Sequence, residues 1–124
     1  MKKHFGGIMI GLLLGLIVGI FIAKILLTSE TISPEYVRVT IVNSTGQTIN
    51  KATLKHENEA FEIRDLSDKS EIKVIFKNAG EGSYIVTALL ENDSTITSKG
   101  IYIEGGYRMT ETVTNKDIHT TYDK

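Results

Sequence analysis

Cysteine and tryptophan are absent from the 124 residues, and proline occurs once, at Pro34. Without cysteine the chain has no disulfide, no thiolate metal ligand, no cysteine nucleophile and no cysteine for lipid attachment. Cationic excess is also absent. The part after Thr28 holds 11 of the 14 Lys and Arg and all 15 Asp and Glu, a net charge of −4. Because phosphate binding needs clustered cations, we expect no nucleic-acid partner.

Charge is missing altogether from residues 5–23, a run of 19 mostly apolar residues. A helix continued to Leu27 would be about 34 Å long, against about 30 Å for the hydrocarbon core of a bilayer. The run predicts a transmembrane helix over residues 5–27. A cleaved signal peptide is the alternative, but it has a shorter apolar region and a small-residue exit. Here the exit carries Leu26 and Leu27, which favours an uncleaved signal anchor over a cleaved signal. A prepilin-type leader is a third alternative, since "KKHFGG" has a basic start and a Gly, but the Glu that normally follows is missing.

The flanking charges predict the orientation of this segment. Lys2, Lys3 and His4 lie in the flank of residues 1–4, which the positive-inside rule keeps in the cytoplasm. Lys24 lies near the far end, where a lysine can extend its ammonium group to the interface. We therefore expect a single-pass protein of the cell inner membrane, with its C-terminal domain periplasmic or extracellular.

Small residues recur every four positions along the predicted helix. Four residues turn a helix by about 400°, so these positions form a slanting groove along one side. Such a groove allows the backbone of another helix to approach closely, although glycine is also common in membrane helices generally. We expect contact with the lipid bilayer and packing against a second copy or other transmembrane helices. The predicted packing residues are Gly7, Gly11, Gly15, Gly19 and Ala23.

The rest of the chain alternates in hydrophobicity with a period of two. After a linker at residues 28–35, about seven short strands are separated by turns. This pattern predicts an all-β fold, an antiparallel β-sandwich over residues 36–114, followed by a polar tail at residues 115–124. The expected strands are residues 36–42, 49–56, 59–66, 71–78, 83–91, 95–104 and 107–114.

Within this pattern, the strand at residues 83–91 is apolar on both faces and is expected to be central. Gly46 is expected in a loop at positive φ, Gly100 in a bulge, and Gly105–Gly106 in a two-residue hairpin. The predicted core residues are Val37, Val39, Ile41, Phe61, Ile63, Ile72, Val74, Phe76 and Tyr84.

Two segments carry a resemblance to known domain architectures. "VNSTGQTINKATL" is similar to the polar loop and returning strand that open many immunoglobulin-like and carboxypeptidase-regulatory-like (transthyretin-type) modules. "GSYIV", with Gly82 and Tyr84, is similar to the Gly-x-Tyr entry to a late strand. The chain has Gly80 where those modules often have an acidic residue, and it lacks the Cys pair and core Trp of antibody-type domains. The resemblance implies an architecture and no particular activity.

Candidate chemical sites are few. His56 in "KHENE" lacks the second histidine of a zincin helix and is expected to be solvated at a strand end. Asp65, Asp68 and Glu71 lie close together in sequence, but their spacing matches no EF-hand loop. Asn43 and Asn92 begin glycosylation sequons, which matter only in a eukaryotic secretory pathway. We expect no metal site, no cofactor and no enzymatic activity.

These features lead to two functional hypotheses. In the first, the chain is a membrane-anchored, non-enzymatic interaction or structural subunit of a bacterial envelope complex, with an unknown protein partner. In the second, the sandwich is a tethered module that binds a carbohydrate, peptide or ion. A flat patch or open sheet edge would favour the first hypothesis, and a concave pocket with convergent polar groups would favour the second.

Overall fold

The computed structural model describes residues 14–18 and 32–123, and the chain divides into two compact units at residues 31 and 32. In the first unit, residues 14–18 are helical and their side chains are exposed. No helix within the described residues is long and apolar enough to cross a membrane. Most of the predicted anchor, including Gly7, Gly11, Gly19 and Ala23, lies outside the described residues.

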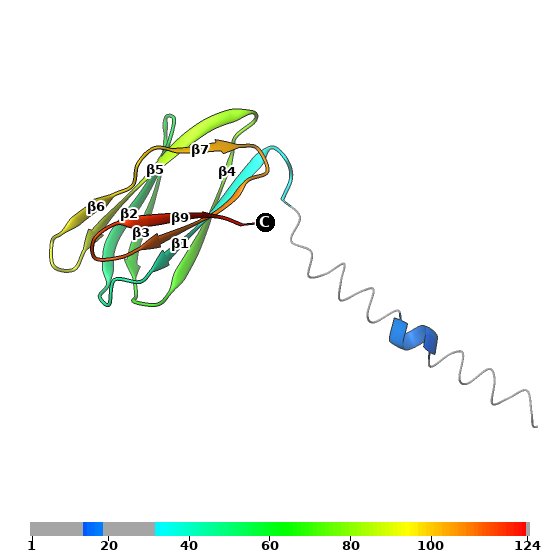
Figure 1. Cartoon of the computed structure of the whole chain (residues 1–124), viewed down its shortest axis with the longest axis horizontal. Coiled ribbons are helices and arrows are strands. Elements are labelled where there is room, and N and C mark those ends of the chain that lie inside the picture. The colour runs from blue at the N-terminus through cyan, green and yellow to red at the C-terminus, as the bar shows by residue number, and fades with distance from the viewer. Residues whose placement is uncertain (1–13, 19–31, 124) are drawn as a thin grey trace, which may run out of the picture. The chain divides into compact units, whose positions relative to one another are not determined.

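The second unit is a β-sandwich of two sheets, which confirms the predicted all-β class (Figure 1). The first sheet has the strand order β4-β1-β8-β9. Two of its three pairings are antiparallel, but β1 and β8 run parallel, with Val39 beside Met109. The sheet is therefore mixed, although the alternation of the sequence had predicted an antiparallel one. Its strands are β1 (Tyr36–Asn43), β4 (Glu71–Lys77), β8 (Arg108–Val113) and β9 (Ile118–Tyr122).

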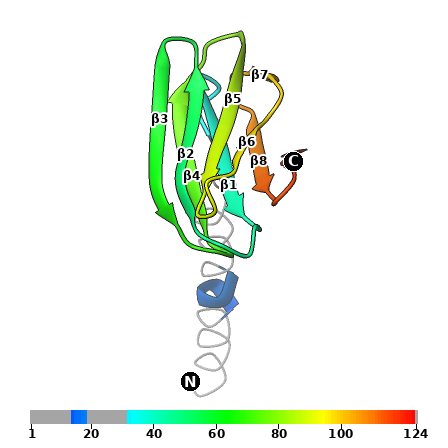
Figure 2. The ribbon, with the colours of Figure 1, turned by 90° about the vertical axis from the view of Figure 1, so that its left-hand side faces the viewer.

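The second sheet has the order β3-β2-β5-β6, and β7 also pairs with β5 beyond the end of β6 (Figure 2). All of its pairings are antiparallel. β5 is central, as expected, but only its inner face is covered, because Ile85 on the outer face is exposed. The strands are β2 (Ile49–His56), β3 (Glu59–Leu66), β5 (Glu81–Leu90), β6 (Thr95–Thr97) and β7 (Ile101–Glu104).

Apolar side chains from the inner faces of both sheets form one core. Phe76 has ring contacts to His56, Phe61 and Tyr84, with centroid distances of 4.6, 5.8 and 6.3 Å. Phe61 is partly buried against this core. Of the predicted core residues, the buried ones are Val37, Val39, Ile41, Ile63, Val74, Phe76 and Tyr84.

Ile72 is an exception among the predicted core residues. It alternates with Val74 and Phe76, which predicted burial, yet its exposed fraction is 37%. Ile72 lies near the start of β4, which is the outermost strand of its sheet. An edge strand is covered only along part of its length, so alternation alone overestimates burial at its ends.

The C-terminal ten residues differ from the predicted polar tail. Residues 118–122 form β9, which pairs with β8 from Val113 and Ile118 to Met109 and Tyr122. The segment is rich in Thr and polar residues because β9 is an edge strand with little core contact. Its alternation is therefore weak, and a strand of this kind was missed.

Two glycine predictions are also corrected. Gly105–Gly106 does not close a hairpin, because β7 belongs to one sheet and β8 to the other. The turn crosses between the sheets and packs against the start of the domain, where a Cβ on Gly105 would lie 2.0 Å from the Pro34 carbonyl oxygen. Gly100 lies in the break between β6 and β7 and not in a bulge. Gly46 has φ +77°, as its predicted loop requires.

Candidate functional site

The candidate metal ligands do not form a site. His56 is buried, contrary to the expectation of a solvated strand end, and its Nδ1 lies 2.9 Å from the Ser83 carbonyl oxygen. Asp68 accepts a hydrogen bond from the Gly46 amide. Within residues 14–18 and 32–123, no group of three or more His, Cys, Asp or Glu is placed to hold a metal ion.

The first predicted sequon is part of the folded interior. Asn43 is fully buried, and its Nδ2 donates hydrogen bonds to the carbonyl oxygens of Gln47 and Leu66 at 2.8 and 2.9 Å. Its Oδ1 accepts from the Thr45 hydroxyl at 2.8 Å. Every polar atom of the side chain is thus used within the domain, so Asn43 acts as a structural link between loops at one end of the sandwich. Asn92, in contrast, is exposed.

A buried polar cluster joins the two sheets. Glu111 on β8 has no exposed surface, and it accepts a hydrogen bond from the Tyr84 hydroxyl on β5. The Thr120 hydroxyl on β9 donates to the other carboxylate oxygen at 2.8 Å. Burial raises the pKa of the Glu111 carboxyl, while hydrogen bonds from Tyr84 and Thr120 and the nearby His119 oppose the rise. Burial and the Glu111 carboxylate raise the pKa of Tyr84, so this phenol is a permanent donor.

Thr120 connects this cluster to the side of the sandwich where β9 faces the loop between β6 and β7. We call this side the open side. One cavity of about 320 Å³ there is bounded by Ile101 and Ile118, together with Lys99 and Asp117. Its complete lining is Thr97, Ser98, Lys99, Ile101, Asp117, Ile118 and Thr120.

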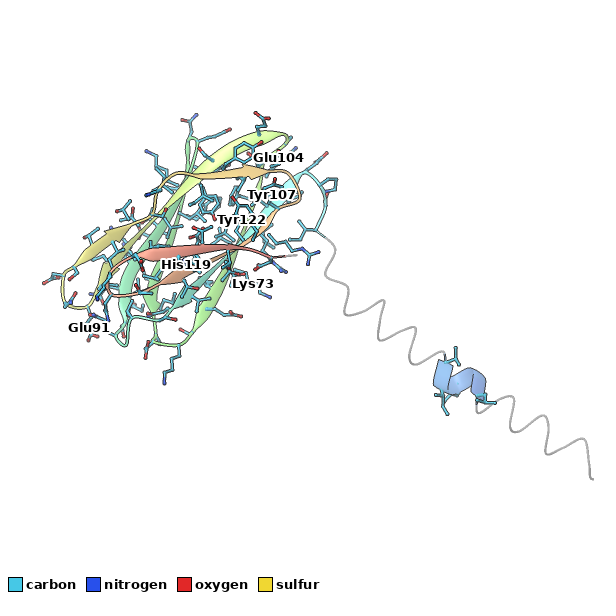
Figure 3. All side chains as sticks on the ribbon, viewed as in Figure 1. Lys73, Glu91, Glu104, Tyr107, His119 and Tyr122 are labelled. Atoms are coloured by element: carbon cyan, nitrogen blue, oxygen red, sulfur yellow. The ribbon has the colours of Figure 1, made fainter. Side chains whose placement is uncertain are left out.

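A second cavity lies further along β9 and contains two tyrosines. It has a volume of about 300 Å³ and is lined by Gly106, Tyr107, Arg108, Tyr122 and Asp123. The rings of Tyr107 and Tyr122 meet edge to face with centroids 6.0 Å apart, and Figure 3 shows them close together. An aromatic wall with one cation and one anion is a composition found in binding sites. The two cavities on the open side are the candidate functional site.

The buried carboxyl predicts a specific pH dependence. A carboxyl with a higher pKa in the folded state than in the unfolded state gives its full stability below the unfolded pKa. That stability is lost as pH rises through the folded value. Wild type should therefore lose stability relative to Glu111→Gln as the pH rises above the ordinary glutamate pKa of 4.5, as measured by urea unfolding at each pH. Gln keeps an acceptor for Tyr84 and carries no charge.

Glu59→Gln is the matched control, because Glu59 is exposed on β3. Its stability should follow that of wild type at every pH. If the curves for Glu111→Gln and wild type stay parallel, burial of Glu111 does not perturb its ionisation.

None of the open-side residues was predicted to be functional. Alternation in "RMTETV" places Glu111 on the inner face, between Met109 and Val113. This pattern could have predicted that Glu111 is buried. Charged residues are almost never fully buried unless they are paired, so a glutamate within a strand is normally assigned to the surface. Ile118, Thr120 and Tyr122 were missed because β9 itself was missed. Gly15, the one predicted packing residue among those described, has open space where a Cβ would be.

Comparison with known proteins supports the fold alone. No family model and no curated protein sequence matches this chain. A protein from Eubacterium rectale whose structure was determined by NMR is similar, with a TM-score of 0.57 and 14% identity over 73% of this chain and 90% of that one. At this identity the similarity shows a shared architecture and carries no statement about function.

Proposed function

We propose that this chain is a single-pass membrane protein whose β-sandwich acts outside the cytoplasm as a non-enzymatic interaction module of a bacterial envelope complex. The observation that carries the proposal is the uncharged run at residues 5–23, which is followed by a short linker and a β-domain. The linker of about eight residues reaches at most about 28 Å. A domain tethered this closely is suited to partners at the same membrane.

The architecture of the β-domain is compatible with this role. We place the domain with the immunoglobulin-like and transthyretin-type modules, which present binding surfaces on a rigid sandwich. Its core is continuous between the sheets, and the open side offers partly buried apolar groups to a partner. Oligomers would form through the glycine positions of the membrane helix.

Binding of a small ligand on the open side is the second candidate. Tyr107 and Tyr122 supply aromatic surface, and Arg108 and Asp123 supply polar contacts. This is a suitable environment for a carbohydrate ring or a peptide side chain. If titration with oligosaccharides changes the spectroscopic signals of both tyrosines, this candidate is favoured over a protein partner.

Retention of the N-terminal segment tests the proposed anchor. We expect the intact mass of the membrane-extracted protein to equal the full chain, with or without Met1, because Leu26 and Leu27 do not suit a signal peptidase. The measurement is mass spectrometry of the detergent-purified protein. A mature form that begins near Ser29 would exclude the anchor and the helix-mediated oligomer together.

A further inference from the structure

We propose that the free edge of β9 binds an extended segment of a partner protein as an added β-strand. In this arrangement, the alternate side chains of that segment enter the two cavities of the open side. The inference rests on the proposed function and specifies what kind of partner the module takes. Three features of β9 and its surroundings support it: the direction of its backbone groups, its lack of edge protection, and the incomplete cover of the core beside it.

The backbone of β9 presents a row of donors and acceptors away from β8. The Asp123 amide donates to the Arg108 carbonyl at 2.9 Å, so Asp123 lies in a hydrogen-bonded pair. Such pairs alternate along an antiparallel ladder. The amide and carbonyl groups of Ile118, Thr120 and Tyr122 therefore point to the free edge. Within the described part of the chain, β9 pairs with β8 alone.

This edge lacks the features that normally prevent strand addition. Proteins protect sheet edges with charged side chains, proline or bulges. β9 has the sequence IHTTY, without Lys, Arg, Asp, Glu or Pro, and every residue but His favours strands. The edge strands on the opposite side of the sandwich, β3 and β4, are protected by charge. Their charged residues are Glu59, Glu62, Arg64, Asp65, Glu71, Lys73 and Lys77.

The two sides of the sandwich differ in what lies between the sheets. On the β3–β4 side, the rings of Phe76 and the partly buried Phe61 stack between the sheets with centroids 5.8 Å apart. On the open side, Ile101, Tyr107 and Ile118 are only partly buried, and the two cavities lie beside them. A strand added to β9 would cover these groups and complete the core.

The cavities specify the chemistry of the added strand. Ile118 and Tyr122 are four residues apart, or about 13 Å along a strand. An added strand therefore presents two large side chains four residues apart, with a small one between them opposite Thr120. Each cavity has one cation and one anion, Lys99 with Asp117 and Arg108 with Asp123. This balance favours uncharged side chains, one of them apolar or aromatic at each end.

A second copy of the chain is the less suitable occupant. Antiparallel pairing of two β9 strands about Thr120 would place Ile118 of each copy opposite Tyr122 of the other. The two-fold axis would then be normal to the sheet, with the two Tyr36 ends at opposite ends of the joined sheet. Two chains anchored in one membrane through short linkers need both of these ends at the same surface.

The test uses the full ¹⁵N-labelled chain in nanodiscs and the peptide KTITSTYTK. Its Ile, Ser and Tyr alternate with Thr, so that they can face Tyr122, Thr120 and Ile118 in antiparallel register. We expect saturable NMR shifts and slower hydrogen exchange of the amides of these three residues. N-methylation of the peptide at Ile, Ser and Tyr should weaken binding at least tenfold, because those amides would pair with β9. N-methylation at three of the four Thr residues, whose amides point away from β9, should have little effect.

Protein variants give a second readout on the same edge. Ile118→Pro removes one outward amide at the first residue of the strand, where proline is tolerated, and should abolish binding. Ile118→Val keeps that amide and should bind like wild type. If Ile118→Pro does not fold, the two methylated peptides still decide.

The proposal is overturned if the NMR shifts do not saturate at millimolar peptide, or if the two methylation patterns weaken binding equally. It is also overturned if the NMR shifts are centred on β3 or β4. Concentration-dependent shifts of the β9 amides without peptide would assign the edge to a second copy and also overturn it. Peptide binding does not depend on membrane orientation. If the topology experiment places the β-domain in the cytoplasm and the peptide still binds, only the extracytoplasmic role is rejected.

Discussion

Replacement of Phe76 by alanine should cost about 3–5 kcal/mol of folding free energy, the range for a buried Phe truncated to Ala. Phe76, on β4 of the first sheet, is almost fully buried and contacts three rings of the second sheet, those of His56, Phe61 and Tyr84. A domain of this size has only about 5–15 kcal/mol of total stability. At about 4–8 °C for each kcal/mol, the melting temperature of fragment 32–124 should fall by more than about 10 °C.

Ile75→Ala is the control for this prediction. Ile75 neighbours Phe76 on β4, but 55% of its surface is exposed, so its truncation should change the melting temperature little. Circular dichroism on heating measures both variants. A shift of under about 2 °C for Phe76→Ala would show that the ring cluster does not hold the sheets together.

Leucine at Gly11 and Gly15 should abolish the proposed association of the predicted membrane helix. If the small residues allow two helix backbones to approach, a branched side chain midway along the groove prevents close contact. At Gly15 a Cβ meets no atom within 4 Å, so the substitution does not disturb the described helix itself. Leucine favours membrane insertion, so anchoring is kept. Crosslinking in membranes should lose the oligomer band.

Leu13→Ile and Leu16→Ile are the matched controls, because they change shape away from the groove and keep the helix apolar. Both should associate like wild type. Equal crosslinking of all four variants would mean that the fourfold spacing has no role in packing. If wild type never crosslinks to itself, and the Gly variants lose a crosslink to a different protein, the groove would be assigned to a heteromeric complex.

Local patterns in the sequence were sufficient for most strands. Clear alternation, as in Val37, Val39 and Ile41, predicted the position and inner face of β1. The same signal identified the segments that became β2 to β5. It works because a half-buried strand must place every second side chain in the core.

The arrangement of the strands required information that local patterns lack. Parallel pairing of β1 with β8 joins residues about 70 positions apart, and alternation does not encode which strands become neighbours. Gly105–Gly106 illustrates this limit. A Gly-Gly pair permits a hairpin, but here the same backbone freedom serves a crossing between sheets.

The candidate site was hidden for a related reason. Edge strands and buried charges are exceptions to the rule of apolar residues inside and polar residues outside. Thr120 on a weakly alternating edge and Glu111 on the inner face both depart from it. Their contact across β8 and β9 became visible only in the folded domain.

The proposed role depends most on which side of the membrane holds the β-domain. The direct measurement is a pair of reporters fused after Lys124, one active only outside the cytoplasm and the other only within it. Because Lys2, Lys3 and His4 precede the uncharged run, we expect activity from the outside reporter and none from the other. Activity of the cytoplasmic reporter alone would contradict the orientation and, with it, the role of the sandwich as an extracytoplasmic interaction module.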